Sequence, residues 1–125
     1  EFINSDIIKY DVVNNGRRLR YDKAFQPQGT NVDFISKIND NEIFVATYER
    51  GVENETLSCG TGATASALIH NHTQNTADGN YEVKVHTKGG LFNVFFNKDN
   101  GLYKHIQLQG PVTLVFEGDV ILPYL

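Results

Sequence analysis

The 125-residue sequence contains one cysteine, three prolines, and neither methionine nor tryptophan. Because a single cysteine cannot form an internal disulfide, we expect a cytoplasmic protein rather than a secreted one. No apolar run approaches the ~18 residues of a membrane-spanning helix, so we expect no membrane span. Since methionine is absent, residue 1 is not a translation start, and we expect the chain to be a piece of a longer protein.

Positive charge is also scarce, because 11 Lys and Arg residues stand against 15 Asp and Glu residues, for a net charge of −4. The one basic cluster, Arg17, Arg18, Arg20 and Lys23, is too small for a nucleic-acid-binding surface, and we interpret it as a solvated face. No spacing of His, Cys and carboxylate residues is typical of a metal site. No glycine-rich loop has the context of a nucleotide site, and no lysine suggests pyridoxal phosphate. We therefore expect no metal and no cofactor.

Several short segments alternate apolar and polar residues, which predicts a domain rich in strands. Turn residues at 39–41, 88–90 and 98–101 separate these segments, and the last four strands are expected to form a meander. The predicted strands are residues 2–8, 31–38, 42–49, 81–87, 91–96, 102–108 and 112–118, and the predicted helices are residues 11–21 and 61–71.

The helix at residues 61–71 consists mainly of small residues, and no charged residue occurs from Gly60 to Asn75. Small side chains allow strands to approach a helix axis closely, whereas a surface helix normally carries charges on one face. We therefore predict an α+β fold in which a mixed, mostly antiparallel, curved sheet wraps around a central helix. Residues 1–125 are expected to form a single domain.

The only cysteine, Cys59, lies directly before a glycine-rich turn and the start of this helix. Unpaired amides at a helix start stabilise a thiolate, which can act as a base. Gly60 and Gly62 let the backbone approach a ligand closely, so that the amides of residues 60–62 can bind a carboxylate. This arrangement suits proton removal beside a carboxylate, although Cys59 could equally be a small buried hydrophobe. A protease-type nucleophile is disfavoured, because no histidine lies at the helix start.

Residues 48–67, YERGVENETLSCGTGATASA, closely resemble the second catalytic-cysteine segment of diaminopimelate epimerase, a cofactor-independent enzyme family of lysine and peptidoglycan biosynthesis. Residues 29–35, the turn at 89–90 and residues 110–118 resemble further family segments in the same order. The resemblance implies that Cys59 is one of two catalytic cysteines, which exchange a proton to interconvert LL- and meso-diaminopimelate. It also implies that the amides of Gly60 and Thr61 hold the reacting carboxylate.

The same resemblance implies three further substrate-binding residues, Asn31, Glu49 and Arg50. Arg50 would hold the distal carboxylate, for which its guanidinium fork is suited. From the residues alone, Glu49 and Arg50 could be an exposed pair at a strand end, and Asn31 could be a turn or cap residue. Residues 52–55 depart from the family pattern by one extra residue, which leaves the loop geometry ahead of Cys59 open.

One thiol reaches only one face of a stereocentre, so the chain lacks half of a two-base apparatus. The histidines offer no replacement, because His70 and His72 fall at the far end of the predicted helix, where a cation suits its dipole. His86 and His105 fall in predicted strands and are interpreted as structural or exposed. We therefore expect the C-terminal half of a two-domain epimerase, inactive by itself, whose partner is an N-terminal domain with the second cysteine. An exposed apolar interdomain face would favour self-association, such as a homodimer.

Two alternatives remain at this point. A proline racemase-like half-domain would share the Cys-Gly-Thr-Gly segment, but it would have little use for Arg50 and Asn31 as anchors of a distal group. A non-catalytic module for ligand binding or dimerisation would have a Cys59 thiol of ordinary reactivity.

Overall fold

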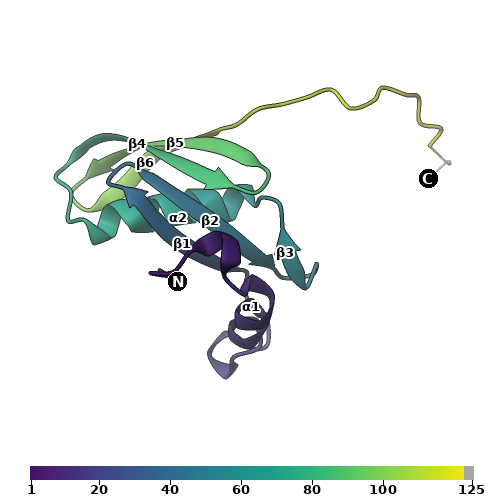
Figure 1. The fold of residues 1–125 in the computed structure, drawn as a ribbon. Helices are drawn as coiled ribbons and strands as arrows, with labels where there is room; N and C mark the ends of the chain where they lie inside the picture. The colour runs from purple at the N-terminus through teal and green to yellow at the C-terminus, as the bar shows by residue number, and fades with distance from the viewer. Residues whose placement is uncertain (123–125) are drawn as a thin grey trace.

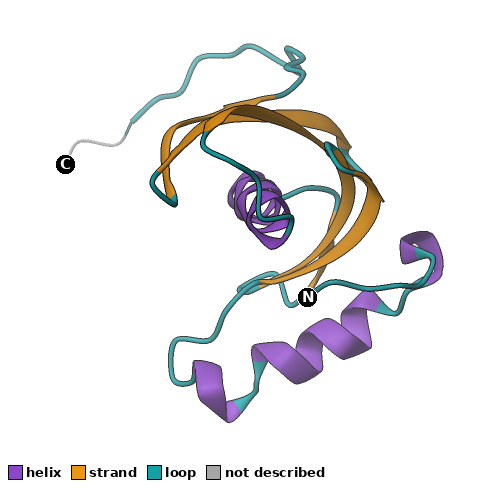
Figure 2. Ribbon diagram, turned by 90° about the vertical axis from the view of Figure 1, so that its left-hand side faces the viewer, coloured by secondary structure: helices purple, strands orange, loops and turns teal. Residues whose placement is uncertain are grey.

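A curved sheet of six strands surrounds one central helix in the computed structural model, which describes residues 1–122 (Figures 1 and 2). A second helix lies outside the sheet, near the N-terminus. The elements in chain order are η1 (Ile7–Lys9), α1 (Val12–Arg20), η2 (Lys23–Phe25), β1 (Val32–Asn39), β2 (Glu42–Glu49), β3 (Asn54–Thr56), α2 (Gly60–Thr73), β4 (Gly79–Thr87), β5 (Gly90–Asp99) and β6 (Leu102–Gln109).

The strands follow the order β1-β2-β4-β5-β6, and the short β3 pairs with β2 beside this path. All neighbours are antiparallel except β2 and β4, which run parallel where Ile43 pairs with Val85. The prediction of an α+β fold with a mixed, mostly antiparallel sheet around a helix is therefore confirmed.

Two apolar clusters hold the domain together, one on each face of β1 and β2. The inner cluster joins the concave face of the sheet to α2, where Ala63 and Ala67 contact the aliphatic side chains of the strands. Gly62 lies so close to β1 that an added Cβ would stand 2.3 Å from the Asp33 carboxylate. The small residues of α2 thus allow the close approach that the sequence predicted. The outer cluster packs α1 and η1 against Phe34 and Tyr48.

Three local predictions were wrong, two of them in the first half of the chain. Residues 2–8 do not form a strand, because only Phe2 bridges to Ile35 and the Asp6 carboxylate then caps η1 by accepting the Ile8 amide at 3.0 Å. The short strand β3 was expected to be a loop, since no apolar alternation marks its sequence. The helix predicted at residues 11–21 is confirmed as α1, with Asp11 as its N-cap.

The predicted strand at residues 112–118 is also absent, because residues 110–122 form an extended tail without regular structure (Figure 1). A strand needs a neighbour to accept and donate its backbone hydrogen bonds. The tail begins with Gly110 and Pro111, leads away from the sheet, and pairs with none of the residues that the structure describes. Its apolar side chains are almost fully exposed, including Val112 at 95% and Phe116 at 84%.

Among residues 1–122, neither helix has the length and apolar character needed to cross a membrane.

Candidate active site

Cys59 is the N-cap residue of α2, with an extended backbone, and the helix begins at Gly60. The thiol is half-buried, and it makes no capping hydrogen bond to the helix. The predicted position at the helix start is therefore confirmed. Because a cysteine replaces the usual capping oxygen, no residue in the range 1–122 accepts a hydrogen bond from the amides of Gly60, Thr61 or Gly62. These amides point their partial positive charge toward the space beside the thiol.

Two polar side chains contact the Cys59 thiol. The Thr61 hydroxyl lies 3.3 Å from Sγ, and the Asn31 amide nitrogen Nδ2 lies 3.9 Å from it. Thr61 comes from the first turn of α2, whereas Asn31 directly precedes β1. The sheet thus brings a residue 28 positions earlier in the chain to the start of the helix.

Asn31 connects the thiol to Arg50. Its Oδ1 accepts the Arg50 backbone amide at 2.9 Å while its Nδ2 faces Cys59. The Arg50 side chain is exposed and donates from Nη1 to the carbonyl oxygen of Gln28 at 2.9 Å. No carboxylate among residues 1–122 lies within ion-pair distance of its guanidinium, so the group can accept an anion.

Glu49 ends β2 next to Arg50 and is half-buried. Its backbone carbonyl accepts the Glu53 amide at 2.8 Å. This bond closes the loop at residues 49–53, here called the arch, which contains Arg50. Five of the six predicted site residues are therefore connected, either by a contact or by being adjacent in sequence: Asn31, Arg50, Cys59, Gly60 and Thr61. Glu49, the sixth, directly precedes Arg50.

The sequence analysis missed a carboxylate behind this site. Asp33 points inward from β1 toward Gly62 and accepts the Thr47 hydroxyl at 2.6 Å. Burial raises the pKa of Asp33, the Thr47 hydrogen bond partly offsets this, and the neighbouring Glu49 charge adds to the rise. The sequence did contain a signal for this carboxylate. In the alternating pattern of β1, Asp33 falls on the same inward face as Ile35.

The β4–β5 turn holds the segment that leads to Cys59. The Gly89 amide donates to the Leu57 carbonyl at 2.7 Å, and the Lys88 ammonium pairs with the Glu55 carboxylate at 2.7 Å. An added Cβ at Gly89 would stand 3.1 Å from the Leu57 oxygen, so a larger residue would crowd this backbone. The turn therefore fixes the approach of the chain to the helix start.

A shallow apolar groove runs along the open side of α2 next to Cys59. It is lined by residues of α2 and by Leu108 of β6; the α2 residues are Gly60, Thr61, Thr64, Ala65 and Leu68. The sheet does not cover this side of the helix (Figure 2).

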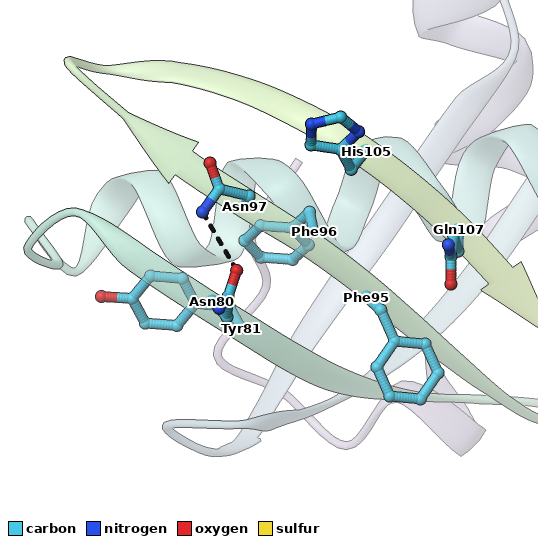
Figure 3. A pocket seen from close by; sticks show the side chains of 7 residues that line it. All are labelled: Asn80, Tyr81, Phe95, Phe96, Asn97, His105 and Gln107. Atoms are coloured by element: carbon cyan, nitrogen blue, oxygen red, sulfur yellow. Dashed lines mark hydrogen bonds between the residues drawn. The ribbon is translucent and has the colours of Figure 1, made fainter.

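Another depression lies across β4, β5 and β6 (Figure 3). Two of its amide side chains bond to each other, since Asn97 donates to Asn80 at 3.0 Å. The Tyr81 hydroxyl donates to the Ala77 carbonyl at 2.7 Å. No carboxylate or thiol lines this depression, so it offers no acid–base pair.

The histidines differ from the prediction in one respect. His70 lies in the last turn of α2, but it is almost completely buried, with Nε2 3.0 Å from the Asp40 carbonyl. Burial lowers the pKa of His70, which disfavours the cation expected at the helix end. His86 forms a pair with Glu42 at 2.5 Å. No group of three His, Cys, Asp or Glu residues in the described part of the chain could hold a metal ion.

Comparisons with known proteins identify the family of this chain. Residues 2–115 match the family described as diaminopimelate epimerase. A diaminopimelate epimerase from Flavobacterium psychrophilum is 40% identical over 112 residues, and one from Aquifex aeolicus is 42% identical over 114 residues. Each alignment covers 90% of this chain but only 43% and 39% of the relative, so the chain spans about two-fifths of the length of these relatives.

A solved structure of a predicted epimerase from Pseudomonas aeruginosa shares the fold, with a TM-score of 0.58 at 12% sequence identity. It covers 79% of this chain, and the match spans 32% of that structure. The family match extends over nearly the whole chain and includes Cys59 and all of its polar contacts. The chain belongs to the diaminopimelate epimerase family.

Proposed function

We propose that residues 1–125 are the C-terminal domain of a two-domain epimerase that interconverts LL- and meso-diaminopimelate in lysine biosynthesis. The observation that carries this proposal is the contact chain from the Cys59 thiol through Asn31 to Arg50. Asn31 connects the thiol to the Arg50 backbone, and the exposed Arg50 guanidinium has no ion-pair partner among residues 1–122, which supports a substrate with an amino-acid group at each end.

In the proposed reaction, the Cys59 thiolate removes the α-proton, so that a new S–H bond forms while the C–H bond breaks. The electron pair stays on the α-carbon next to its carboxylate. The unpaired amides of Gly60 and Thr61 stabilise the negative charge that develops on the carboxylate oxygens. A second thiol on the opposite face donates a proton to the carbon and completes the inversion. The reaction needs no pyridoxal phosphate, because the protein amides take over the stabilisation of charge.

Arg50, Asn31 and Glu49 are proposed to bind the distal end of the substrate. The Arg50 guanidinium would form a bidentate pair with the distal carboxylate. Asn31 and Glu49 would accept or donate hydrogen bonds to the distal amino-acid group. Because Asn31 contacts both Arg50 and Cys59, it sets the spacing between the distal and the reacting ends.

The second thiol is proposed to come from an N-terminal domain that docks beside Cys59. Three observations support a missing partner surface: the chain spans about two-fifths of its relatives, the groove along α2 is apolar and open, and residues 110–122 expose apolar side chains. By itself, this chain is expected to be inactive. We propose a cytoplasmic location, which its one free thiol supports.

The test is exchange of the substrate α-hydrogen with deuterium from solvent, followed by NMR with the full-length protein. Incorporation from both diaminopimelate isomers, but not from proline or hydroxyproline, is the expected result. Exchange of proline would instead favour the racemase-like alternative, and no exchange with any of these substrates would refute the catalytic proposal. The 125-residue chain serves as the control and is expected to give no exchange.

A further inference from the structure

Arg20 is enclosed, although the sequence placed it in a solvated basic cluster. Its side chain is only 13% exposed, whereas Arg17, Arg18 and Lys23 are exposed. Two nitrogens of the guanidinium, Nε and Nη2, both lie 3.1 Å from Oε1 of Glu53. The interpretation of the cluster as a solvated face is therefore wrong for Arg20.

Glu53 belongs to the loop with the extra residue, and it binds the backbone on both sides of Arg50. Its carboxylate accepts the Gly51 amide at 3.1 Å, and its own amide donates to the Glu49 carbonyl at 2.8 Å. The residue adopts a left-handed backbone with φ of 57°, which the surrounding bonds must stabilise. The Tyr48 hydroxyl donates to the second carboxylate oxygen at 3.2 Å. Glu53 therefore fixes the arch from which the Arg50 side chain projects.

The other side of the Arg20 guanidinium supports the Asn31 loop. Gly29, with φ of 66°, lies directly against this group, and an added Cβ would stand 1.8 Å from Nη1. Two residues later the chain reaches Asn31, whose Oδ1 accepts the Arg50 amide. A single enclosed cation thus lies between the loop that carries Asn31 and the arch that carries Arg50.

We propose that Arg20 and Glu53 form a positioning pair that sets the placement of Asn31 and Arg50 and thereby determines recognition of the distal end of the substrate. The predicted effect on substrate binding rests on the proposed function. The predicted effect of the pair on the two loops does not. The pair acts through Asn31 and Arg50. The extra residue in the loop at residues 52–55 contributes to this pair, because Glu53 contacts Arg20 from the longer loop.

The structural part is tested without substrate, by amide hydrogen exchange of the 125-residue chain followed by NMR. In Glu53→Gln and in Arg20→Lys, the amides of Gly51 and Arg50 are expected to exchange about tenfold faster, because a charge-assisted bond is replaced by a weaker one. The Ala63 amide in α2 should keep its rate. The matched control is Asp99→Asn, which removes an exposed ion pair with Lys104 of comparable chemistry. Unchanged exchange rates of the Gly51 and Arg50 amides in both variants would overturn the proposal that the pair positions these residues.

The functional part is tested by kinetics of the full-length protein with diaminopimelate. Both variants are expected to raise KM by about tenfold and to change kcat by less than about threefold, because a misplaced anchor weakens binding more than chemistry. A merely structural role would lower Tm and leave KM unchanged, and that result would overturn the inference. If the wild-type protein does not act on diaminopimelate, the proposed function fails, whereas the exchange experiment still decides whether the pair holds the two loops.

Discussion

At the start of α2 the polar groups lack partners, whereas at its end they are satisfied by the surrounding fold. The amides of Gly60 and Thr61 have no acceptor among residues 1–122, and the Cys59 thiol has only weak contacts. At the other end, Asn71 accepts hydrogen bonds from Thr76 and Tyr103. The His70 ring and the Gln74 amide both reach the Asp40 carbonyl at 3.0 Å.

This contrast separates the two uses of polar groups within one helix. Buried polar groups with complete hydrogen bonding fix a structure, and removing one partner leaves the other unsatisfied. Groups without partners add little to stability and remain available for a ligand. We therefore expect substitutions at the helix start to affect activity and substitutions at the helix end to affect stability.

The largest effect is expected for Cys59→Ala at the open end. In the full-length protein, this variant should lower deuterium exchange into diaminopimelate by about 10³-fold or more, because the proton-transfer group is lost. The Tm of the 125-residue chain should stay within about 2 °C, since Cys59 makes no capping bond. The control is the exposed neighbour variant Ser58→Ala, with an expected rate within about threefold of wild type. Full activity of Cys59→Ala would remove the distinction between the two ends.

The second effect concerns the closed end. Asn71→Leu preserves side-chain size but leaves the Tyr103 and Thr76 hydroxyls without their acceptor. We expect a loss of about 2–3 kcal/mol in the free energy of unfolding, measured by urea denaturation of the chain. The rate per folded molecule of the full-length protein should remain near that of wild type. His72→Gln, at an exposed neighbouring position, is the control. A selective loss of activity without a loss of stability would contradict the assignment.

A smaller effect is expected for Arg50→Lys, which returns to the open end. Lysine keeps the charge but loses the planar fork, so KM for diaminopimelate should rise about tenfold, or about 1.4 kcal/mol. Stability should change by less than about 0.5 kcal/mol, because the side chain is exposed. The measurement is steady-state kinetics with the full-length protein, together with urea denaturation. An unchanged KM would mean that Arg50 does not bind the distal carboxylate.

The smallest effect comes from His70 at the closed end. Because the folded-state pKa of His70 lies below its ordinary value near 6.5, the unfolded chain binds a proton that the folded chain excludes. Stability should therefore fall as pH drops below about 6.5 and should be constant above it. Lys37 and Asp40 face the ring and partly compensate each other.

The measurement compares urea midpoints at pH 7.5 and pH 5.5 for the wild-type chain and for His70→Gln. The variant should be less stable at both pH values but should show a flatter pH dependence between them. Carboxylates with a lowered pKa, such as Asp40 and Glu42, lose their stabilising charge only at lower pH. An equal slope in both proteins would show that His70 is not the group that titrates.

Local patterns predicted most of the fold. Alternating residues located β1, β2 and β4–β6, and the small, uncharged helix predicted that the sheet would wrap around it. The strand prediction at residues 112–118 was wrong for a physical reason. Alternation shows which face of a strand each side chain would occupy, but it does not show whether a neighbouring strand is present to pair with it. At residues 2–8, the Asp6 side chain bonds the local backbone and favours a turn over a strand.

The candidate site shows the same division. The position of Cys59 at a helix start was predictable from glycines and small residues. Its contact with Asn31 was expected only through resemblance to a family, because nothing local brings those residues together. Arg20 was misinterpreted for a related reason: four basic residues in one segment look alike, and of these four only Arg20 forms an ion pair, within residues 1–122, with a carboxylate far away in the chain.

The sequence by itself determined the helix with a thiol at its start, the strands with their inward faces, and the lack of a second thiol. These depend on chirality, side-chain size and nearest neighbours along the chain. Tertiary structure alone decided which polar groups would be satisfied. Asp33, His70 and Arg20 became enclosed because of contacts between residues far apart in the chain. The helix-start amides stayed available because neither Cys59 nor any other residue in the range 1–122 accepts their hydrogen bonds.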